Sequence, residues 1–255
     1  MDGTLLDENG ELNKEFFVIF KRLVEKEIKF VVASGRQYNK LSSIFKSIND
    51  DIIYIAENGT IVKYREKELY SSTLDREETM DLVKDIQDID GTFLVLCGKN
   101  CAYTNIDKKE FITEIEKYYS SYKIVKDFTT IEDEFIKIAV YDTKGVLNNS
   151  LPALSPKWKN KYQLTASSLV WLDIYNNEAN KGVAINMIQK KFKITPEETM
   201  AFGDYYNDVE MLKAAYHSYA MENAPVGVKK HANFMAKSNM ENGVLEVIKR
   251  VVLSS

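Results

Sequence analysis

Two aspartates, Asp204 and Asp208, stand four positions apart just after the apolar segment at residues 199–202. If a single turn joins that segment to a following helix, side chains with this spacing lie on one face of the helix. Two carboxylates at the end of one strand attract a hard divalent cation, and Mg²⁺ prefers such oxygen ligands. The pair therefore predicts a magnesium site.

Ser34 and Gly35 end a second apolar segment, at residues 30–33. A hydroxyl and a backbone N–H at a strand-to-helix turn can hold an anion, and the dipole of the following helix adds to the attraction. A cation site and an anion site at the ends of two strands together predict a Mg²⁺-assisted phosphoryl site.

Each motif alone also has a structural interpretation. A Ser-Gly-Arg turn at residues 34–36 is a common way to end a strand, and the acidic residues at 204–208 could simply cap a helix. Lys181 alone could be a solvated side chain near a helix start, and Cys97 and Cys101 are interpreted as structural or incidental thiols. The functional hypothesis therefore depends on the motifs occurring together.

The elements that must position these residues alternate between strand and helix. Strands are predicted at residues 30–33, 52–56, 199–202, 216–221 and 233–236, and helices at 16–27, 38–48, 183–192 and 224–230. This alternation favours an α/β fold, a Rossmann-like parallel sheet covered by helices on both faces. In such a sheet, ligands bind at the carboxyl ends of the strands, where the polar motifs stand.

The alternation breaks between about residues 76 and 174. Helices are predicted there at 76–89 and 108–119, and strands at 92–96, 101–104, 134–141, 162–166 and 169–174. We interpret this stretch as an inserted α+β domain, large enough to fold over its own core. The predicted domains are a core of residues 1–75 and 175–255 and an insert of residues 76–174.

Composition excludes several classes of protein. The 255 residues carry 34 Lys and Arg against 38 Asp and Glu, so no excess of basic charge favours a nucleic-acid polymer as partner. Two Cys and two His are too few for a disulfide framework or a four-Cys zinc site. No apolar run reaches the length of a membrane span, and residues 1–4 do not resemble a signal peptide, so we expect a cytoplasmic protein without a membrane partner.

Four motifs in order resemble those of the haloacid dehalogenase-like hydrolases, specifically the Cof-type class IIB phosphatases. They are Met1-Asp2-Gly3-Thr4-Leu5-Leu6, Ser34-Gly35-Arg36, Asn180-Lys181-Gly182 and Gly203-Asp204-x-x-Asn207-Asp208. Residues 57–59, 221–224 and 242–244 also fit that family, so the resemblance covers essentially the whole core. It implies that the insert is the cap domain of that class, which closes over the active site.

The resemblance also implies roles for individual residues. Asp2 would be the general acid and base, and its carbonyl a Mg²⁺ ligand. Asp204 would be the side-chain metal ligand, with Asp208 as a supporting carboxylate. The phosphate-holding positions would be Ser34, Gly35, Lys181 and Asn207. Mg²⁺, Lys181 and amide donors would stabilise the negative charge on the transferring phosphoryl group.

The first motif of the family is Asp-x-Asp-Gly-Thr, and its first Asp is the nucleophile that forms an aspartyl-phosphate. Met1 occupies the middle position, so the nucleophile and the apolar strand that carries it would precede Met1. We expect the chain to be a truncated enzyme, because Asp2, Lys181, Asp204 and Asp208 all remain; the alternative is a non-catalytic relative.

We therefore expect a Mg²⁺-dependent phosphoric monoester hydrolase of small phosphorylated metabolites, impaired in this form and either a monomer or a homodimer. Two alternatives stay open: a phosphomutase of the same superfamily, and a non-catalytic protein that binds a phosphorylated metabolite.

Overall fold

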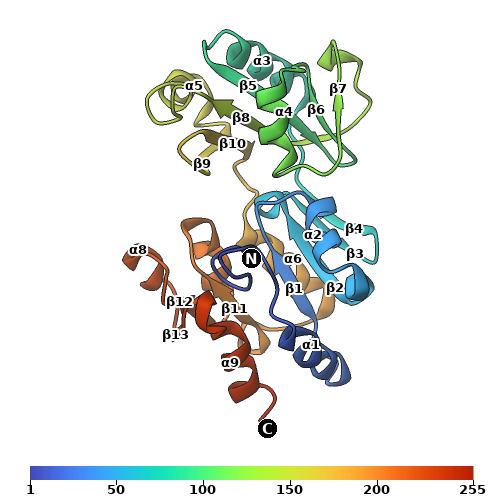
Figure 1. Cartoon of the computed structure of the whole chain (residues 1–255), viewed down its shortest axis with the longest axis vertical. Coiled ribbons are helices and arrows are strands. Elements are labelled where there is room, and N and C mark those ends of the chain that lie inside the picture. The colour runs from blue at the N-terminus through green and yellow to red at the C-terminus, as the bar shows by residue number, and fades with distance from the viewer. Residues whose placement is uncertain (255) are drawn as a thin grey trace. The chain divides into compact units, whose positions relative to one another are not determined.

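A computed structural model describes residues 1–254. The chain divides into two compact units, which Figure 1 draws as ribbons. The first unit contains Met1–Gly35, Phe45–Tyr70 and the chain from Asn180 onward; the second contains Arg36–Ile44 and Ser71–Ala179. Each unit is described separately below, and the predicted domain boundaries stay a prediction.

The first unit is built on parallel strands, as predicted. Its strands are β1 (Phe30–Ala33), β2 (Ile52–Ala56), β3 (Ile61–Tyr64), β4 (Lys67–Ser71), β11 (Met200–Gly203), β12 (His217–Met221) and β13 (Phe234–Ala236). β1 pairs parallel with β2, and β12 pairs parallel with β11 and β13. β3 runs antiparallel to β2, because the short turn at Glu57–Gly59 cannot cross back over the sheet.

Helices cover both faces of β2. The helices of the first unit are α1 (Glu15–Glu25), α6 (Lys181–Phe192), α7 (Val209–Lys213), α8 (Val226–Lys229) and α9 (Gly243–Val251). Ile53 and Ile55 share a buried core with α6 and α7, whereas the Tyr54 ring lies near Phe45, which packs on Phe16 of α1. Because neighbouring side chains of a strand point to opposite faces, these contacts fix which helices lie on which face.

The strands of the first unit form two separate ladders, in the orders β1-β2-β3-β4 and β11-β12-β13. Val31 and Ala33 of β1 and Ala201 of β11 nevertheless contribute to one core. In Figure 1 the N-terminal segment lies between β1 and β11. Within residues 1–254, one edge of β1 and one edge of β11 therefore lack a neighbouring strand.

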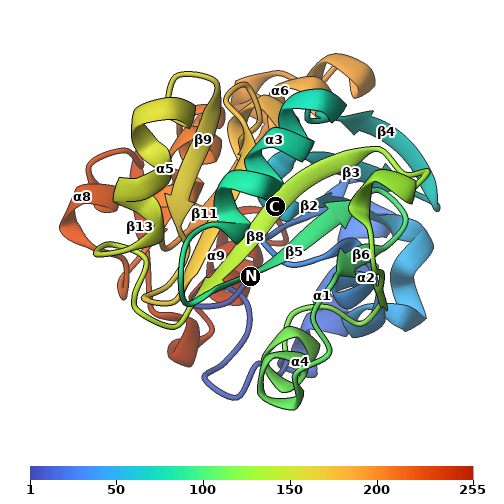
Figure 2. The ribbon, with the colours of Figure 1, turned by 90° about the horizontal axis from the view of Figure 1, so that it is seen from above.

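The second unit is a six-stranded sheet in the order β7-β6-β5-β8-β10-β9. Its strands are β5 (Thr92–Gly98), β6 (Ala102–Thr104), β7 (Tyr122–Ile124), β8 (Phe135–Asp142), β9 (Tyr162–Ala166) and β10 (Trp171–Asn176), and its helices are α2 (Tyr38–Ile44), α3 (Arg76–Gln87), α4 (Lys109–Glu116) and α5 (Ser150–Trp158). Figure 2 shows α3 crossing β5 and β8, which it contacts. One buried cluster joins Leu94, Ile138 and Leu172 of the sheet to Leu82 of α3 and Leu154 of α5.

Several elements were not predicted. The hairpin β3–β4, the short strand β7 and the helices α5 and α9 all fall outside the predicted ranges. α5 contains Pro156, which is unfavourable inside a helix. α9 begins after Asn242, which has a left-handed backbone conformation, yet it buries Val244 and Ile248 at helical spacing. None of the helices in the described chain is long and apolar enough to cross a membrane.

Asp142 at the end of β8 organises the start of α5. Its carboxylate accepts hydrogen bonds from the Ser150 amide at 2.9 Å, the Lys144 amide at 3.0 Å and Asn149 Nδ2 at 3.0 Å, and the residue is fully buried. Burial alone would raise the pKa of Asp142, but these hydrogen bonds lower it below its ordinary value. The carboxylate form is thus the one that the fold stabilises.

We expect Asp142→Ala to lower the free energy of unfolding by about 2 kcal/mol, because buried amides lose their acceptor. The pKa of Asp142 is lower in the folded than in the unfolded chain, so its contribution is present above the unfolded pKa of about 3.9 and is lost as pH falls through the folded pKa. Thermal unfolding across pH tests this. The gap between wild type and variant should shrink in acid, and an exposed aspartate changed likewise, Asp81→Ala, should show little effect at any pH.

Candidate active site

The first residues of the chain form a tight turn. The carbonyl of Met1 accepts hydrogen bonds from the amides of Leu5, at 2.9 Å, and Leu6, at 3.0 Å. Gly3 has φ of +68°, a conformation that glycine adopts without a Cβ clash. Asn223 Nδ2 donates to the Gly3 carbonyl at 2.8 Å and ties this turn to the end of β12. The turn is thereby held rigidly.

Asp204 packs directly against this turn. The Thr4 hydroxyl donates to Asp204 Oδ1, and a Cβ placed on Gly3 would lie 2.3 Å from Asp204 Oδ2. Only glycine at position 3 therefore leaves space for the carboxylate. Burial raises the pKa of Asp204, and the nearby Asp208 carboxylate raises it further, against the hydrogen bond from Thr4.

The Asp208 side chain is buried, and both of its carboxylate oxygens accept hydrogen bonds. Lys181 Nζ donates to its Oδ1 at 2.6 Å, and its Oδ2 accepts from the amides of Asp204, at 3.0 Å, and Tyr205, at 3.2 Å. Burial would raise the pKa of Asp208, but the positive charge of Lys181 holds it below the ordinary value. Asp208 therefore holds the ammonium group of Lys181 and the backbone N–H of Asp204 in place.

The two aspartates do not share one face of a helix. Asp204 lies in the loop after β11, a 3₁₀ turn covers Tyr206–Asp208, and α7 begins only at Val209. The carboxylate of Asp208 instead folds back onto the loop. Gly203 allows this, because a Cβ there would lie 2.6 Å from the Asp208 Cβ.

The α-amino group of Met1 lies among these charges. Burial lowers its pKa, the positive charge of Lys181 lowers it further, and Asp208 and Asp204 act in the opposite direction. The amine thus lies close enough to Lys181, Asp204 and Asp208 for their charges to act on it. A residue joined to Met1 through this amine would therefore start beside these three charged side chains.

Ser34, Gly35 and Asn207 meet around Asn58. The Ser34 carbonyl accepts from the Asn58 amide at 3.1 Å, and Asn207 Nδ2 donates to Asn58 Oδ1 at 3.0 Å. A Cβ placed on Gly35 would lie 2.9 Å from that same oxygen. Asn58 therefore joins the ends of β1 and β2 through its backbone N–H and contacts the loop after β11 through its side-chain amide.

The turn that presents Asn58 is strained. Glu57, Asn58 and Gly59 have φ of +49°, +60° and +100° in succession. Non-glycine residues rarely adopt such angles, and strain of this kind concentrates at functional sites. The turn lies against the start of α6, since a Cβ on Gly59 would lie 2.4 Å from the carbonyl carbon and oxygen of Asn180.

We expect Gly59→Ala to move Asn180 and the adjoining Lys181. The methyl group adds a backbone clash to the cost of a left-handed alanine, together about 2 kcal/mol or more. Gly10→Ala is a matched control, because Gly10 has φ of +77° and nothing within 4 Å of its added Cβ. Differential scanning calorimetry should show a clearly larger loss of melting temperature for Gly59→Ala. Equal losses would mean that the approach to Asn180 is not tight in solution.

The predicted site residues are thus partly brought together. Lys181, Asp204 and Asp208 form one cluster, and Ser34, Gly35 and Asn207 meet around Asn58. The Asp2 side chain is exposed. Within residues 1–254, no group of three or more His, Cys, Asp and Glu side chains is arranged to hold a metal ion. Three supporting residues, Thr4, Asn58 and Asn223, were not predicted as site residues, although each lies in a segment whose sequence resembles the family.

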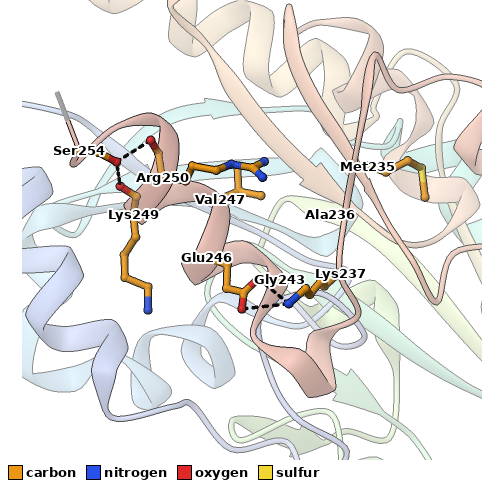
Figure 3. Close-up of a pocket in the computed structure, with 9 residues that line it drawn as sticks. All are labelled: Met235, Ala236, Lys237, Gly243, Glu246, Val247, Lys249, Arg250 and Ser254. Carbon is orange, nitrogen blue, oxygen red and sulfur yellow. Dashed lines mark hydrogen bonds and ion pairs between the residues drawn. The ribbon is translucent and has the colours of Figure 1, made fainter.

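The pocket in Figure 3 is a different feature. It lies between β13 and α9, has a volume of about 450 Å³ and is lined by residues that include Met235, Lys237, Val247 and Arg250. Gly243 lines it, but none of the candidate site residues Asp2, Ser34, Gly35, Lys181, Asp204, Asn207 and Asp208 does, so it is not the candidate active site.

Known proteins resemble this chain over almost its full length. The sequence model of the haloacid dehalogenase-like hydrolases matches residues 1–248. The phosphatase YbjI of Escherichia coli K12, named a 5-amino-6-(5-phospho-D-ribitylamino)uracil phosphatase, is 32% identical over 99% of this chain and 94% of its own. A crystal structure of a Streptococcus mutans UA159 protein superposes with a TM-score of 0.88 at 31% identity, covering 100% of this chain and 97% of that one.

A haloacid dehalogenase subclass IIB sugar phosphatase shares the fold, with a TM-score of 0.80 at 23% identity over 98% of this chain and 96% of that one. These likenesses confirm the family resemblance and the α/β fold class predicted from the sequence. The chain therefore belongs to the haloacid dehalogenase-like hydrolases, and its enzyme class is that of the phosphoric monoester hydrolases.

Proposed function

We propose that this chain is built to hydrolyse small phosphorylated metabolites with Mg²⁺ as cofactor. The observation that carries the proposal is the buried Lys181–Asp208 pair, at 2.6 Å, held beside Asp204 and the N-terminal turn. A fixed ammonium next to a partly buried carboxylate suits a phosphoryl group bridged to a metal ion.

Asp204 and the Asp2 carbonyl would hold Mg²⁺. Oxygen donors of this kind fit the ion, and the raised pKa of Asp204 marks a carboxylate that a cation would stabilise. Because Lys181 and two backbone amides already occupy Asp208, its part would be to orient Asp204 and Lys181. When bound, the ion would neutralise charge on the phosphoryl oxygens.

Ser34, Gly35, Asn207 and Lys181 would hold the phosphate group. Asp2 would give its proton to the departing alcohol and then take a proton from the attacking water. The nucleophile would be an aspartate directly before Met1: its oxygen bonds to phosphorus while the ester P–O bond breaks, and water then cleaves the aspartyl-phosphate.

In this proposal the core is residues 1–75 and 175–255, and residues 76–174 are the cap. The core motifs deal with phosphate and metal, which every substrate of this class shares, so the cap would contribute to substrate choice and exclude water. Because YbjI is named for a phosphorylated ribitylamino-pyrimidine, substrates of that chemical kind belong in any first panel.

Calorimetric titration with Mg²⁺ tests the metal site. We expect Asp204→Asn to weaken Mg²⁺ binding by at least about tenfold, because a neutral amide replaces the side-chain ligand. Asp51→Asn, which changes an exposed aspartate of the same unit, should leave the affinity unchanged. Equal losses for both variants, or no loss for Asp204→Asn, would contradict the assignment.

A further inference from the structure

Two adjacent tyrosines stand exposed directly beside the candidate site. Tyr205 and Tyr206 follow Asp204 in the loop after β11, and they are 53% and 58% exposed. Large side chains next to a phosphate and metal site are available to the remainder of the substrate. Neither has a role in the chemistry proposed above.

The pair is held in place and not loosely attached. The Tyr205 amide donates to the buried Asp208 carboxylate at 3.2 Å, and its carbonyl accepts from the Asp208 amide at 3.0 Å. The Tyr206 ring passes over Gly227, where a Cβ would lie 2.9 Å from its hydroxyl oxygen. The two rings meet edge to face, with centroids 5.4 Å apart and planes at 77°.

This arrangement has the properties of a stacking platform. Gly227 borders the Tyr206 ring, the hydrogen bonds with Asp208 fix the Tyr205 backbone, and the Tyr205 ring packs on the Tyr206 ring, which lowers the side-chain entropy lost when a ligand binds. Aromatic rings pack favourably on other planar rings, by offset stacking or edge to face. An acyclic polyol offers no such face.

We propose that Tyr205, braced by Tyr206, binds a planar unsaturated ring in the alcohol part of the substrate. The inference rests on the proposed function and names its substrate class: a phosphate monoester whose phosphate reaches Asp204 and Lys181 while a heteroaromatic ring lies on the tyrosine pair. Tyr205 is thus a binding residue and takes no part in the proton or phosphoryl transfers.

Two probes that differ mainly in the ring test this. Riboflavin 5′-phosphate carries a planar ring on a ribityl phosphate, and ribitol 5-phosphate lacks the ring. In calorimetric titrations with Mg²⁺ present, we expect the chain to bind the flavin probe about tenfold more tightly, in line with aromatic stacking on bases. Tyr205→Ala should remove this preference, and Tyr205→Phe should keep it, while the affinity for ribitol 5-phosphate stays unchanged in both.

Tyr216→Ala is the matched control. Tyr216 is also 53% exposed and also meets a ring edge to face, that of His217, but it precedes β12 at the opposite end of the strand from the site. This variant should behave as wild type. Equal affinity for the two probes, or a preference that survives Tyr205→Ala, would overturn the stacking proposal while leaving phosphate binding intact. If neither ribitol 5-phosphate nor inorganic phosphate binds, the proposed function fails and the inference fails with it.

Discussion

Extending the chain by an apolar strand that ends in Asp directly before Met1 should switch on phosphate release. We expect turnover of p-nitrophenyl phosphate to rise by at least about a thousandfold over the chain that begins at Met1, because removing a nucleophile costs an enzyme at least that much. The charges of Lys181, Asp204 and Asp208 act on the Met1 amine, so an added carboxylate would begin beside the groups that are proposed to hold phosphate and metal.

The same extension should stabilise the fold. Among the described residues, β1 pairs only with β2 and β11 only with β12, although both contribute to one core. An added strand between them would satisfy backbone groups on both edges, each worth about 1 kcal/mol. At this size 1 kcal/mol corresponds to roughly 2–4 °C, so the melting temperature should rise by several degrees.

An extension that ends in Asn separates the two effects. It supplies the same strand without a nucleophile, so it should raise the melting temperature as the Asp version does and leave turnover at background. Activity with both versions would show that the added carboxylate is not the nucleophile. No gain in stability with either would mean that the two ladders do not accept a strand between them.

The strands that bear the motifs could be predicted because their apolar runs are short and end in polar turns. The runs at residues 30–33 and 52–56 coincide with β1 and β2. β4 was not predicted, because Lys67 and Glu68 give its start the composition of an exposed loop. A strand at the edge of a sheet can carry such charges, and they protect it from pairing with other chains.

The sequence motifs identify candidate site residues but not how their side chains are arranged. The positions of Lys181, Asp204 and Asp208 follow from the motifs, but the helical-face argument for the two aspartates was wrong. Spacing in the sequence cannot reveal that Asp208 turns back to accept the Asp204 amide, because this depends on the loop conformation that Gly203 permits. The role of Asn58 could not be predicted either, because it contacts Ser34 and Asn207, which are distant from it in the sequence.

Replacing Lys181 should damage both stability and catalysis, for reasons that can be separated. Lys181 and Asp208 are 3% and 4% exposed, so Lys181→Ala leaves a buried carboxylate without its cation. Breaking such a pair costs about 3–5 kcal/mol. Lys213 makes an ion pair of similar length with Glu210, at 2.7 Å, on the surface. Lys213→Ala should cost no more than about 1 kcal/mol, because solvent screens the exposed pair.

A double variant distinguishes a catalytic effect of Lys181 from a loss of folding. Lys181→Met with Asp208→Asn removes both charges and keeps the volumes similar, so it should recover much of the stability lost in Lys181→Ala. In the extended chain its kcat/KM should nevertheless stay at least about tenfold below wild type, because the variant lacks the ammonium that is proposed to stabilise the transferring phosphoryl group. If stability and kcat/KM recover together, Lys181 serves only to hold Asp208, and phosphate is stabilised by other donors.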